Sequence, residues 1–181
     1  METIEVVLTY KHYAALPNDG RRYEIHEGDL SVSLTPSPWH QLISGNLMVA
    51  LHSHVNARGL GQVFPPLDVI LSDTTIVQPD IVFVGADRLE RISERGIEGA
   101  PTLVVEILLP RTRQIDRYVK TRLYARHGIP YYWMVDRDAH GVECYTLDDS
   151  NYTLSAWLTG DQTLDSAPFP DLGLPLASLW A

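Results

Sequence analysis

One acidic residue inside a continuous apolar run constrains the fold of this chain more than any other feature. Residues 103–109 read LVVEILL, in which Glu106 is the one polar position. A run that is apolar throughout is typical of a strand covered on both faces, because a strand with one exposed face alternates apolar and polar residues. Burying a carboxylate there without a partner costs on the order of several kcal/mol or shifts its pKa. The run therefore predicts a central sheet covered on both faces, with a metal ion, a cation or a protonated group beside Glu106.

Segments with helical and strand spacing alternate along the rest of the chain. Ser37 and Pro38 are typical of the N-cap and the first residue of a helix, which should end before Gly59. The other expected elements are a short helix over 10–16, a hairpin over 21–34 turning at Glu27-Gly28, strands over 61–73, 76–85, 103–110 and 131–136, a helix over 115–127, a hairpin over 142–157 and an apolar tail over 169–180. This order predicts an α/β (α+β) fold with a mixed central sheet, helices on its faces and extra N- and C-terminal hairpins.

The length and the cysteine content fit one domain. A chain of 181 residues buries about 70% of the surface of its extended form, which is enough for a core without disulfides. Cys144 is the single cysteine, so it forms no disulfide within the chain. No apolar run reaches the roughly 18 residues of a membrane span, and the N-terminus lacks the pattern of a signal peptide. We expect a single domain over residues 1–181 that is cytoplasmic and has no membrane partner.

The charge of the chain is unevenly distributed. The formal net charge is −9 at pH 7, which disfavours general binding to nucleic-acid phosphates. Between Arg88 and Arg126, however, there are nine basic and five acidic residues, whereas the rest of the chain has five basic and 18 acidic residues. The sequence therefore predicts one positive surface on an acidic protein, and binding that depends strongly on salt.

Asp80 and Glu106 are the first candidates for a metal site. Asp80 follows Pro79 at the start of the apolar stretch IVFV, and Glu106 lies in the next buried strand. Carboxylate oxygens on neighbouring strands are ligands that Mg²⁺ prefers. The alternative for Asp80 is a turn residue that caps the strand entry. The alternative for Glu106 is a buried salt bridge to an arginine.

Three further residues are candidates for the same site. Lys120 lies four residues from both Asp116 and Tyr124 on the expected helix, so the three share one face. The alternative is an exposed Asp116–Lys120 pair. Glu24 stands between two apolar strand residues and faces either the metal or solvent. His40, in the first turn of its helix, either binds a phosphate or a carboxylate or is an ordinary surface or core histidine.

Several short motifs together resemble the Uma2 family, formerly the domain of unknown function 820. They are RRYEIHEGDL, PSPWHQ, QPDIVFV, GAPTLVVEILLP, YYWMVD and the D-x-x-x-K-x-x-x-Y spacing of Asp116, Lys120 and Tyr124. The resemblance runs from about Tyr10 to the terminal PDLGLPLASLW, and the ordered set is specific although each motif alone is weak. It implies the restriction-endonuclease-like fold of the PD-(D/E)xK superfamily, a mixed sheet between two helices, and a Mg²⁺-dependent phosphodiesterase centre.

The resemblance also implies roles for single residues. Asp80 matches the aspartate of the PD motif, Glu106 the acidic residue of the following strand, Lys120 the lysine of the next helix and Glu24 the Y-E motif. The lysine of the superfamily's E-x-K is replaced by Leu108, so the lysine is expected from the helix. Where the family usually has Ser-Pro-Ser-Thr, residues 109–112 are Leu-Pro-Arg-Thr, which removes a serine near the site.

Two functions follow from these residues. The first is an endonuclease dependent on Mg²⁺ or Mn²⁺, with nucleic acid, expected to be DNA, as substrate. Its metal ligands are Asp80, Glu106 and Glu24, its catalytic lysine is Lys120, and its substrate-binding residues are His40, Arg113, Arg117 and Tyr124. The second is a catalytically weak or inactive module that binds nucleic acid or a protein partner, an alternative raised by Leu108 and Leu109. A homodimer is also considered, because two-fold dimers are common.

Overall fold

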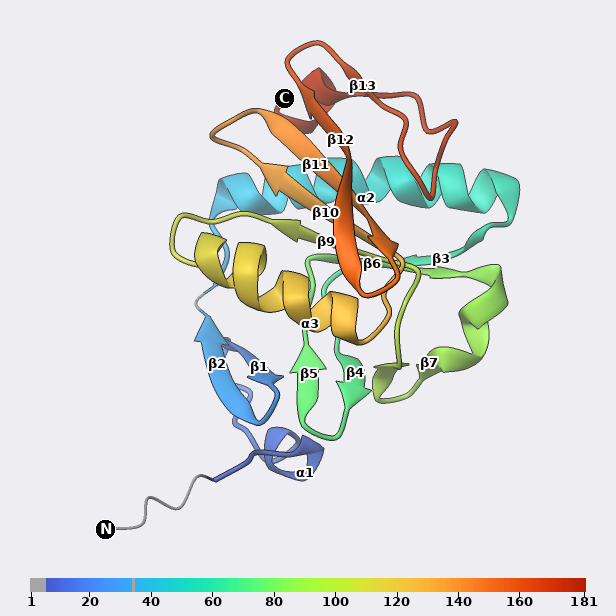
Figure 1. Cartoon of the computed structure of the whole chain (residues 1–181). Helices are drawn as coiled ribbons and strands as arrows, with labels where there is room; N and C mark the ends of the chain where they lie inside the picture. The colour runs from blue at the N-terminus through green and yellow to red at the C-terminus, as the bar shows by residue number, and fades with distance from the viewer. Residues whose placement is uncertain (1–5, 34) are drawn as a thin grey trace.

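A six-stranded mixed sheet with helices on both faces forms the centre of the molecule (Figure 1). The computed structural model describes residues 6–33 and 35–181. In spatial order the strands of this sheet are β12 (Asn151–Thr159), β11 (Gly141–Asp148), β10 (Tyr131–Asp136), β9 (Leu103–Ile107), β6 (Ile81–Gly85) and β3 (Gly61–Phe64). β9 and β10 run parallel, and the other neighbours are antiparallel. The predicted mixed sheet is confirmed.

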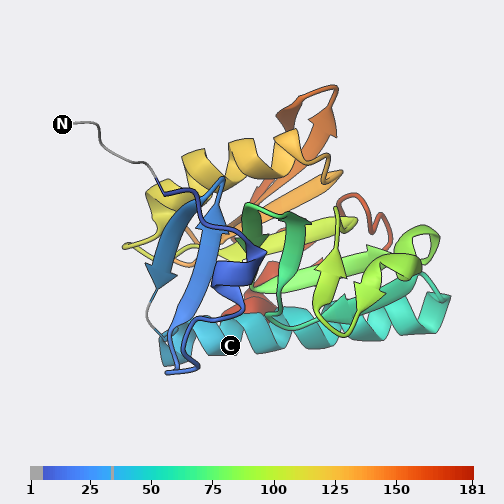
Figure 2. The same cartoon turned by 90° about the horizontal axis from the view of Figure 1, so that it is seen from below.

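The helices form the outer layers. α2 (Pro38–Arg58) crosses one face of the sheet, and on the other face a π-helix, η2 (Ile115–Lys120), continues into α3 (Thr121–Arg126). Viewed from below, α2 and α3 lie on opposite sides of the strands (Figure 2). The short helices are α1 (Tyr10–Tyr13) and the 3₁₀ helices η1 (Ala86–Arg91) and η3 (Leu176–Leu179). Within residues 6–33 and 35–181, no helix is long and apolar enough to cross a membrane.

A second sheet of short strands lies beside the central one. Its spatial order is β2 (Asp29–Ser33), β1 (Arg22–His26), β5 (Thr75–Val77), β4 (Val69–Ser72), β8 (Gly96–Glu98) and β7 (Ile92–Ser93). A two-stranded sheet joins β13 (Thr163–Leu164) to β14 (Leu174–Pro175). The predicted N-terminal hairpin is β1 and β2, and its turn residues Glu27 and Gly28 both have positive φ. Such angles are those of the tight turns that favour glycine.

The division between the two sheets corrects the strand prediction. Residues 61–73 and 76–85 were each expected to form one strand, but each is split between the two sheets: β3 and β6 belong to the central sheet, β4 and β5 to the second. Prolines at 65, 66 and 79 interrupt the two segments, and proline cannot donate a hydrogen bond to a strand ladder. No element was expected between β6 and β9, where the structure has η1, β7 and β8.

The central sheet has a core on each face, and β9 contributes to both. Val105 packs on the α2 side with Trp133, whereas Val104 packs on the α3 side with Tyr132. Since side chains alternate along a strand, Glu106 lies on the α3 side. The apolar tail completes the core on the α2 side with Phe169, Leu176 and Leu179.

The expected ends of α2 are confirmed. The side chain of Ser37 accepts a hydrogen bond from the backbone amide of His40, Pro38 is the first residue, and Gly59 follows the last turn with φ of 63°. This capping fixes the direction in which the first turn of α2 meets the sheet. Leu34, the last residue of the expected hairpin, and residues 1–5, where the signal-peptide pattern was sought, lie outside the described residues.

Candidate active site

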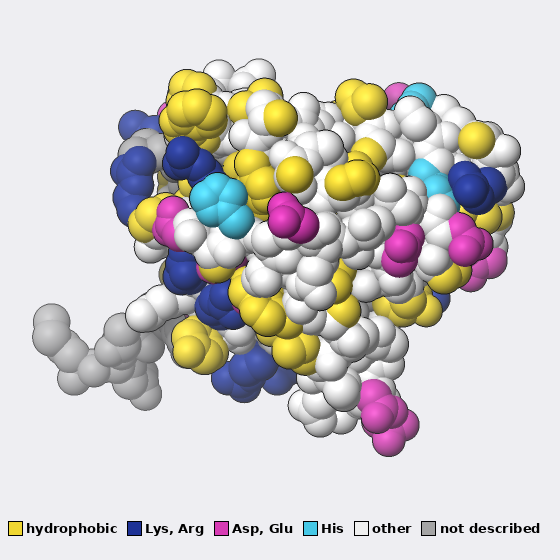
Figure 3. All heavy atoms as spheres, turned by 90° about the horizontal axis from the view of Figure 1, so that it is seen from above, with side chains coloured by type: hydrophobic (Ala, Val, Ile, Leu, Met, Phe, Trp, Pro, Cys, Tyr) yellow, Lys and Arg dark blue, Asp and Glu magenta, His cyan; other side chains and the backbone are white. Residues whose placement is uncertain are grey.

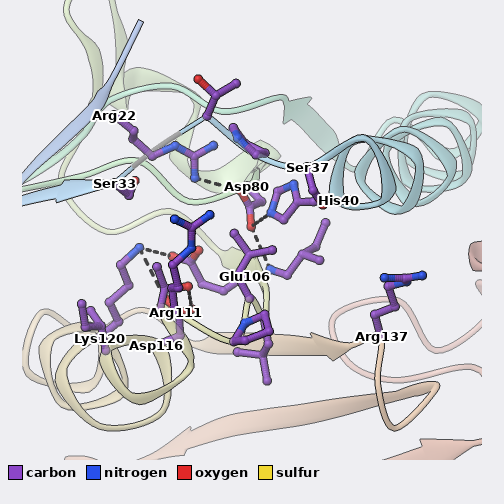
Figure 4. Close-up of a pocket in the computed structure, with 18 of the residues that line it drawn as sticks. Arg22, Ser33, Ser37, His40, Asp80, Glu106, Arg111, Asp116, Lys120 and Arg137 are labelled. Atoms are coloured by element: carbon purple, nitrogen blue, oxygen red, sulfur yellow. Dashed lines mark hydrogen bonds and ion pairs between the residues drawn. The ribbon is translucent and has the colours of Figure 1, made fainter.

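A pocket of about 560 Å³ opens where both sheets meet the two helical layers. Five of the candidate residues line it: Glu24, His40, Asp80, Glu106 and Lys120. They come from β1, α2, the residue before β6, β9 and η2, so the site is assembled from segments far apart in the sequence (Figure 4). Sequence reasoning did not select the charged lining residues Arg22, Arg111, Arg137 and Asp138, and it placed Asp116 only on the helix face of Lys120.

Asp80 is held as a carboxylate at the start of β6. Its Oδ2 lies 2.9 Å from Nε2 of His40 and accepts the amide of Ile107 at 2.8 Å, and its Oδ1 accepts Nη1 of Arg22 at 2.8 Å. Burial disfavours the charged form, but the contacts to His40, Arg22 and Ile107 outweigh it and lower the pKa of Asp80. His40 therefore binds a carboxylate, one of its two predicted roles, and its buried Nδ1 has no partner among the described residues.

Glu106 has the opposite electrostatic balance. Its Oε1 accepts Nζ of Lys120 at 2.9 Å and the hydroxyl of Tyr124 at 2.5 Å, while Oε2 accepts no hydrogen bond from the described residues. Burial raises its pKa, Lys120 opposes this, and the nearby carboxylates of Asp116, Asp80 and Glu24 raise it again, to about 8. Glu106 is therefore the carboxyl group of the pocket that holds a proton most readily.

Lys120 is the buried cation at the centre of three carboxylates. Its Nζ lies 2.9 Å from Oε1 of Glu24, 2.9 Å from Oε1 of Glu106 and 3.7 Å from Oδ1 of Asp116. Burial lowers the pKa of Lys120, but the three carboxylates outweigh it and raise the pKa. An exposed Asp116–Lys120 pair is wrong, because the two residues are only 3% and 4% exposed.

Glu24 is buried as well, so its solvent-facing alternative is also wrong. Oε1 accepts the amide of Gln78 at 2.7 Å in addition to Lys120, and Oε2 lies 3.1 Å from Nε2 of His26. Burial opposes its ionisation, but Lys120 and His26 lower the pKa of Glu24.

The buried salt bridge of Glu106 is made by a lysine from the helix, Lys120, and not by an arginine. Leu108, at the position of the superfamily lysine, is buried in the core on the α3 side.

The expected helix over 115–127 begins as a π-helix and not as an α-helix. The carbonyl oxygen of Asp116 accepts the hydroxyl of Tyr132 at 3.0 Å and that of Thr121 at 3.1 Å. These two hydroxyl groups stabilise a carbonyl that the wider helix leaves poorly satisfied, and π-helical turns are frequent at functional sites. Asp116 and Lys120 still face the pocket, and the Asp116 carboxylate accepts the hydroxyl of Thr112 at 3.0 Å.

The structure does not bring Arg113 and Arg117 to the pocket. Arg113 binds Asp136 at 3.0 Å, and Arg117 binds Glu143 at 2.5 Å, so acidic residues of β10 and β11 occupy both guanidinium groups. This pairing reduces the positive surface expected from the basic window. Lys and Arg side chains nevertheless gather at one side of the molecule, while acidic ones are scattered over the visible face (Figure 3). Arginines that do line the pocket are Arg22, Arg111 and Arg137.

Comparison with known proteins assigns the chain to a family. The family model of Uma2, described as "Putative restriction endonuclease", matches residues 10–177. The chain belongs to the Uma2 family. The crystal structure of a "putative nuclease belonging to DUF820" from Anabaena variabilis is 22% identical, covers 96% of this chain and 97% of its own, and superposes with a TM-score of 0.78. This similarity shows a shared fold, and the description of the Uma2 family supports a nuclease-like function.

Other comparisons with this Uma2 chain are weaker. The type IIG restriction endonuclease BpuSI is 15% identical, with a TM-score of 0.43, over 82% of this chain and 16% of its own. No curated protein matches the sequence.

The oxygen atoms of this Uma2 pocket fit a hydrated divalent ion. In the described part of the chain, no three or more His, Cys, Asp or Glu side chains form a metal-binding group. Mg²⁺ does not need one, because it keeps several waters and binds one or two carboxylates together with substrate phosphates. Oε2 of Glu106 has no hydrogen-bond partner among the described residues, and Oδ1 of Asp80 accepts only Arg22. These two hard oxygen ligands suit Mg²⁺ or Mn²⁺.

Proposed function

We propose that this Uma2 protein is an endonuclease that depends on Mg²⁺, or on Mn²⁺, and hydrolyses phosphodiester bonds of nucleic acid, with DNA as the expected substrate. One observation carries the proposal: Asp80 and Glu106 line the same pocket as Lys120, whose ammonium group lies 2.9 Å from Glu106. A carboxylate pair can hold a divalent ion that activates water, and a buried lysine can stabilise negative charge on a phosphate, so these groups suit metal-assisted phosphodiester hydrolysis.

Asp80 and Glu106 would hold the metal ion, and Glu24, which lines the same pocket, binds Lys120. Bound there, the ion would polarise a phosphate oxygen and lower the pKa of a bound water. His40 and the amide of Ile107 keep Asp80 ionised and fixed in orientation. Glu106 must release its proton to act as a ligand, since a protonated carboxyl is a poor one.

Lys120 supplies a fixed positive charge beside the reacting phosphate. Its ammonium group is already oriented by Glu24 and Glu106, so it donates a hydrogen bond to developing negative charge without further rearrangement. Arg22, Arg111 and Arg137 line the same pocket and would bind the flanking phosphates. Tyr124, predicted to bind substrate, donates its hydroxyl to Glu106 and is not among the lining residues, so its proposed role is to position Glu106.

The experiment is nicking of supercoiled plasmid DNA with Mg²⁺ or Mn²⁺. We expect Asp80→Asn, Glu106→Gln and Lys120→Met each to lower the rate by at least about 100-fold. The matched control is Glu90→Gln, since Glu90 is 71% exposed and lies outside the pocket, and it should cleave like the wild type. Circular dichroism confirms that each variant is folded. Undiminished nicking by all three pocket variants would contradict the proposal that this pocket is the active site.

A second candidate is a module that binds nucleic acid or a protein partner without cleaving. It is favoured by the internal neutralisation of the site, because Lys120 and Arg22 already pair with Glu24, Glu106 and Asp80. Calorimetry with Mg²⁺ and Mn²⁺ separates the two. Metal binding at low millimolar concentration supports the endonuclease, whereas nucleic-acid binding without any metal binding supports the module.

A further inference from the structure

A tryptophan and an arginine meet in solvent beside the pocket. Trp39, in the first turn of α2, is 54% exposed, and Cζ of Arg137 lies 4.8 Å from the centre of its ring. Arg137 belongs to the turn between β10 and β11 and lines the pocket (Figure 4). Exposed pairs of this kind add little to stability, so folding alone gives no reason to keep this large ring in water.

The position of Trp39 ties it to the reactive groups. The next residue, His40, points inward and lies 2.9 Å from Oδ2 of Asp80. Successive side chains on an α-helix diverge by about 100°, so Trp39 projects beside the pocket and not into it. The guanidinium group of Arg137 covers one face of the ring, and the exposed remainder is open to a planar ligand.

The pocket itself is small and its positive charge is limited. A volume of about 560 Å³ is that of a site for a ligand of small-molecule size, which suits one or two nucleotides of a single strand. Arg113 and Arg117 are paired with acidic residues, and the chain has a net charge of −9. Tight binding through many phosphate contacts along a duplex is therefore not available, and affinity needs a second source.

We propose that Trp39, backed by Arg137, is a stacking platform for an unpaired nucleobase next to the phosphate in the pocket. The inference rests on the proposed function, because it requires a nucleic-acid phosphate at Asp80 and Glu106. Single-strand-binding proteins combine a cationic groove with aromatic rings on which any base stacks. A base paired within a duplex does not reach such a ring. The substrate class is accordingly a single strand, or a strand end separated from its complement.

The test is binding of fluorescently labelled oligonucleotides, followed by anisotropy with Ca²⁺ in place of Mg²⁺. The three probes are a 12-residue oligothymidylate, an abasic strand with the same number of phosphates, and a 12-base-pair duplex. We expect the wild type to bind the oligothymidylate about tenfold more tightly than either of the other two. Trp39→Ala should remove this preference and leave the affinity for the abasic strand unchanged, while Trp39→Phe should keep most of it.

The matched control is Trp157→Ala, because Trp157 is another exposed tryptophan, 43% accessible, on β12 and outside the pocket. It should bind all three probes like the wild type. Equal binding of the oligothymidylate and the abasic strand by the wild type, or no binding of either, overturns the proposal. So does a Trp39→Ala effect that is the same for both strands, or one that appears only as a changed oligomeric state in analytical ultracentrifugation.

Failure of the proposed function is distinguishable from failure of this inference. Cleavage is measured separately with Mg²⁺, whereas the binding assay needs no chemistry. If the protein prefers the oligothymidylate over the abasic strand through Trp39 but does not cleave, the stacking platform is supported and the endonuclease is contradicted. If the protein cleaves but binds the abasic strand as tightly as the oligothymidylate, the endonuclease is supported and the stacking platform is contradicted.

Discussion

Replacing Lys120 by methionine tests how much the buried ion pairs of the pocket contribute to the free energy of unfolding. At an effective dielectric constant of about 20, a charge pair at 2.9 Å attracts by about 6 kcal/mol. Lys120 makes one such pair with Glu24, and a second with Glu106 to the extent that Glu106, whose pKa is raised to about 8, is ionised. Desolvation of the ammonium and carboxylate groups offsets most of this attraction. Breaking a buried pair by removing one partner typically costs about 3–5 kcal/mol, because the other charge stays buried without compensation. We expect Lys120→Met to lower the free energy of unfolding by this amount near neutral pH.

The loss should depend on pH in a defined direction. Without Lys120, the raised pKa values of Glu106 and Asp116 in the folded protein rise further, and Glu24 loses a cation that lowers its pKa. The folded variant then binds more protons than the unfolded chain, so its stability falls as the pH rises through these pKa values. The difference from the wild type is therefore larger at about pH 8 than at about pH 5, where protonated carboxyl groups need no cation.

The assay is urea unfolding followed by circular dichroism in EDTA at both pH values. The matched control is Lys11→Met, since Lys11 is the other lysine of the chain and is exposed. It should match the wild type within about 0.5 kcal/mol. A Lys120→Met variant as stable as the wild type at about pH 8 would refute the reasoning, and so would a loss that is larger at about pH 5.

Three further predictions follow from single residues. In EDTA, wild-type stability should fall as the pH rises from about 5 to 8, because the pKa of Glu106 is raised from 4.5 to about 8 in the folded protein; Glu106→Gln should flatten this fall in thermal unfolding. Trp133→Ala should cost about 3–5 kcal/mol in urea unfolding, since the ring is fully buried and leaves a cavity. Gly61→Ala should destabilise by more than about 1 kcal/mol, because φ is 143° and a Cβ would lie 2.1 Å from the carbonyl oxygen of Val84. The control, Gly45→Ala within α2, has no atom within 4 Å of the added Cβ and should stabilise by up to about 1 kcal/mol.

The central strand and its carboxylate were predictable because they obey local rules. An apolar run of residues 103–109 has to be covered on both faces, and a charged group within it has to have a partner. The spacing of Asp116, Lys120 and Tyr124 likewise predicted that the three share one helix face, and the structure shows that this face is buried. Capping at Ser37 also depends on only a few adjacent residues and was confirmed.

Features set by contacts between distant segments were not predictable in the same way. Arg113 and Arg117 look like free cations in a basic window, but their partners lie about 20 to 30 residues along the chain, on β10 and β11. In the π-helix, the carbonyl oxygen of Asp116 accepts the hydroxyl of Tyr132, which is 16 residues along the chain. Arg22 could have been selected, because it lies two residues from Glu24 on one strand, and side chains so spaced share a face. The predicted homodimer, the metal ion and the DNA substrate stay predictions.

The amide of Ile107 has a partner that few strand amides have. It donates to Oδ2 of Asp80 at 2.8 Å, so a backbone group at the end of the central strand is bonded to a carboxylate of the pocket. The resonance of an amide proton follows the charge on its acceptor. In protein labelled with ¹⁵N, this single signal would report directly when Asp80 gains a proton, a cation or a neighbouring phosphate. The fold thus contains its own spectroscopic probe of the pocket, at a place where no substitution and no attached reporter group is needed.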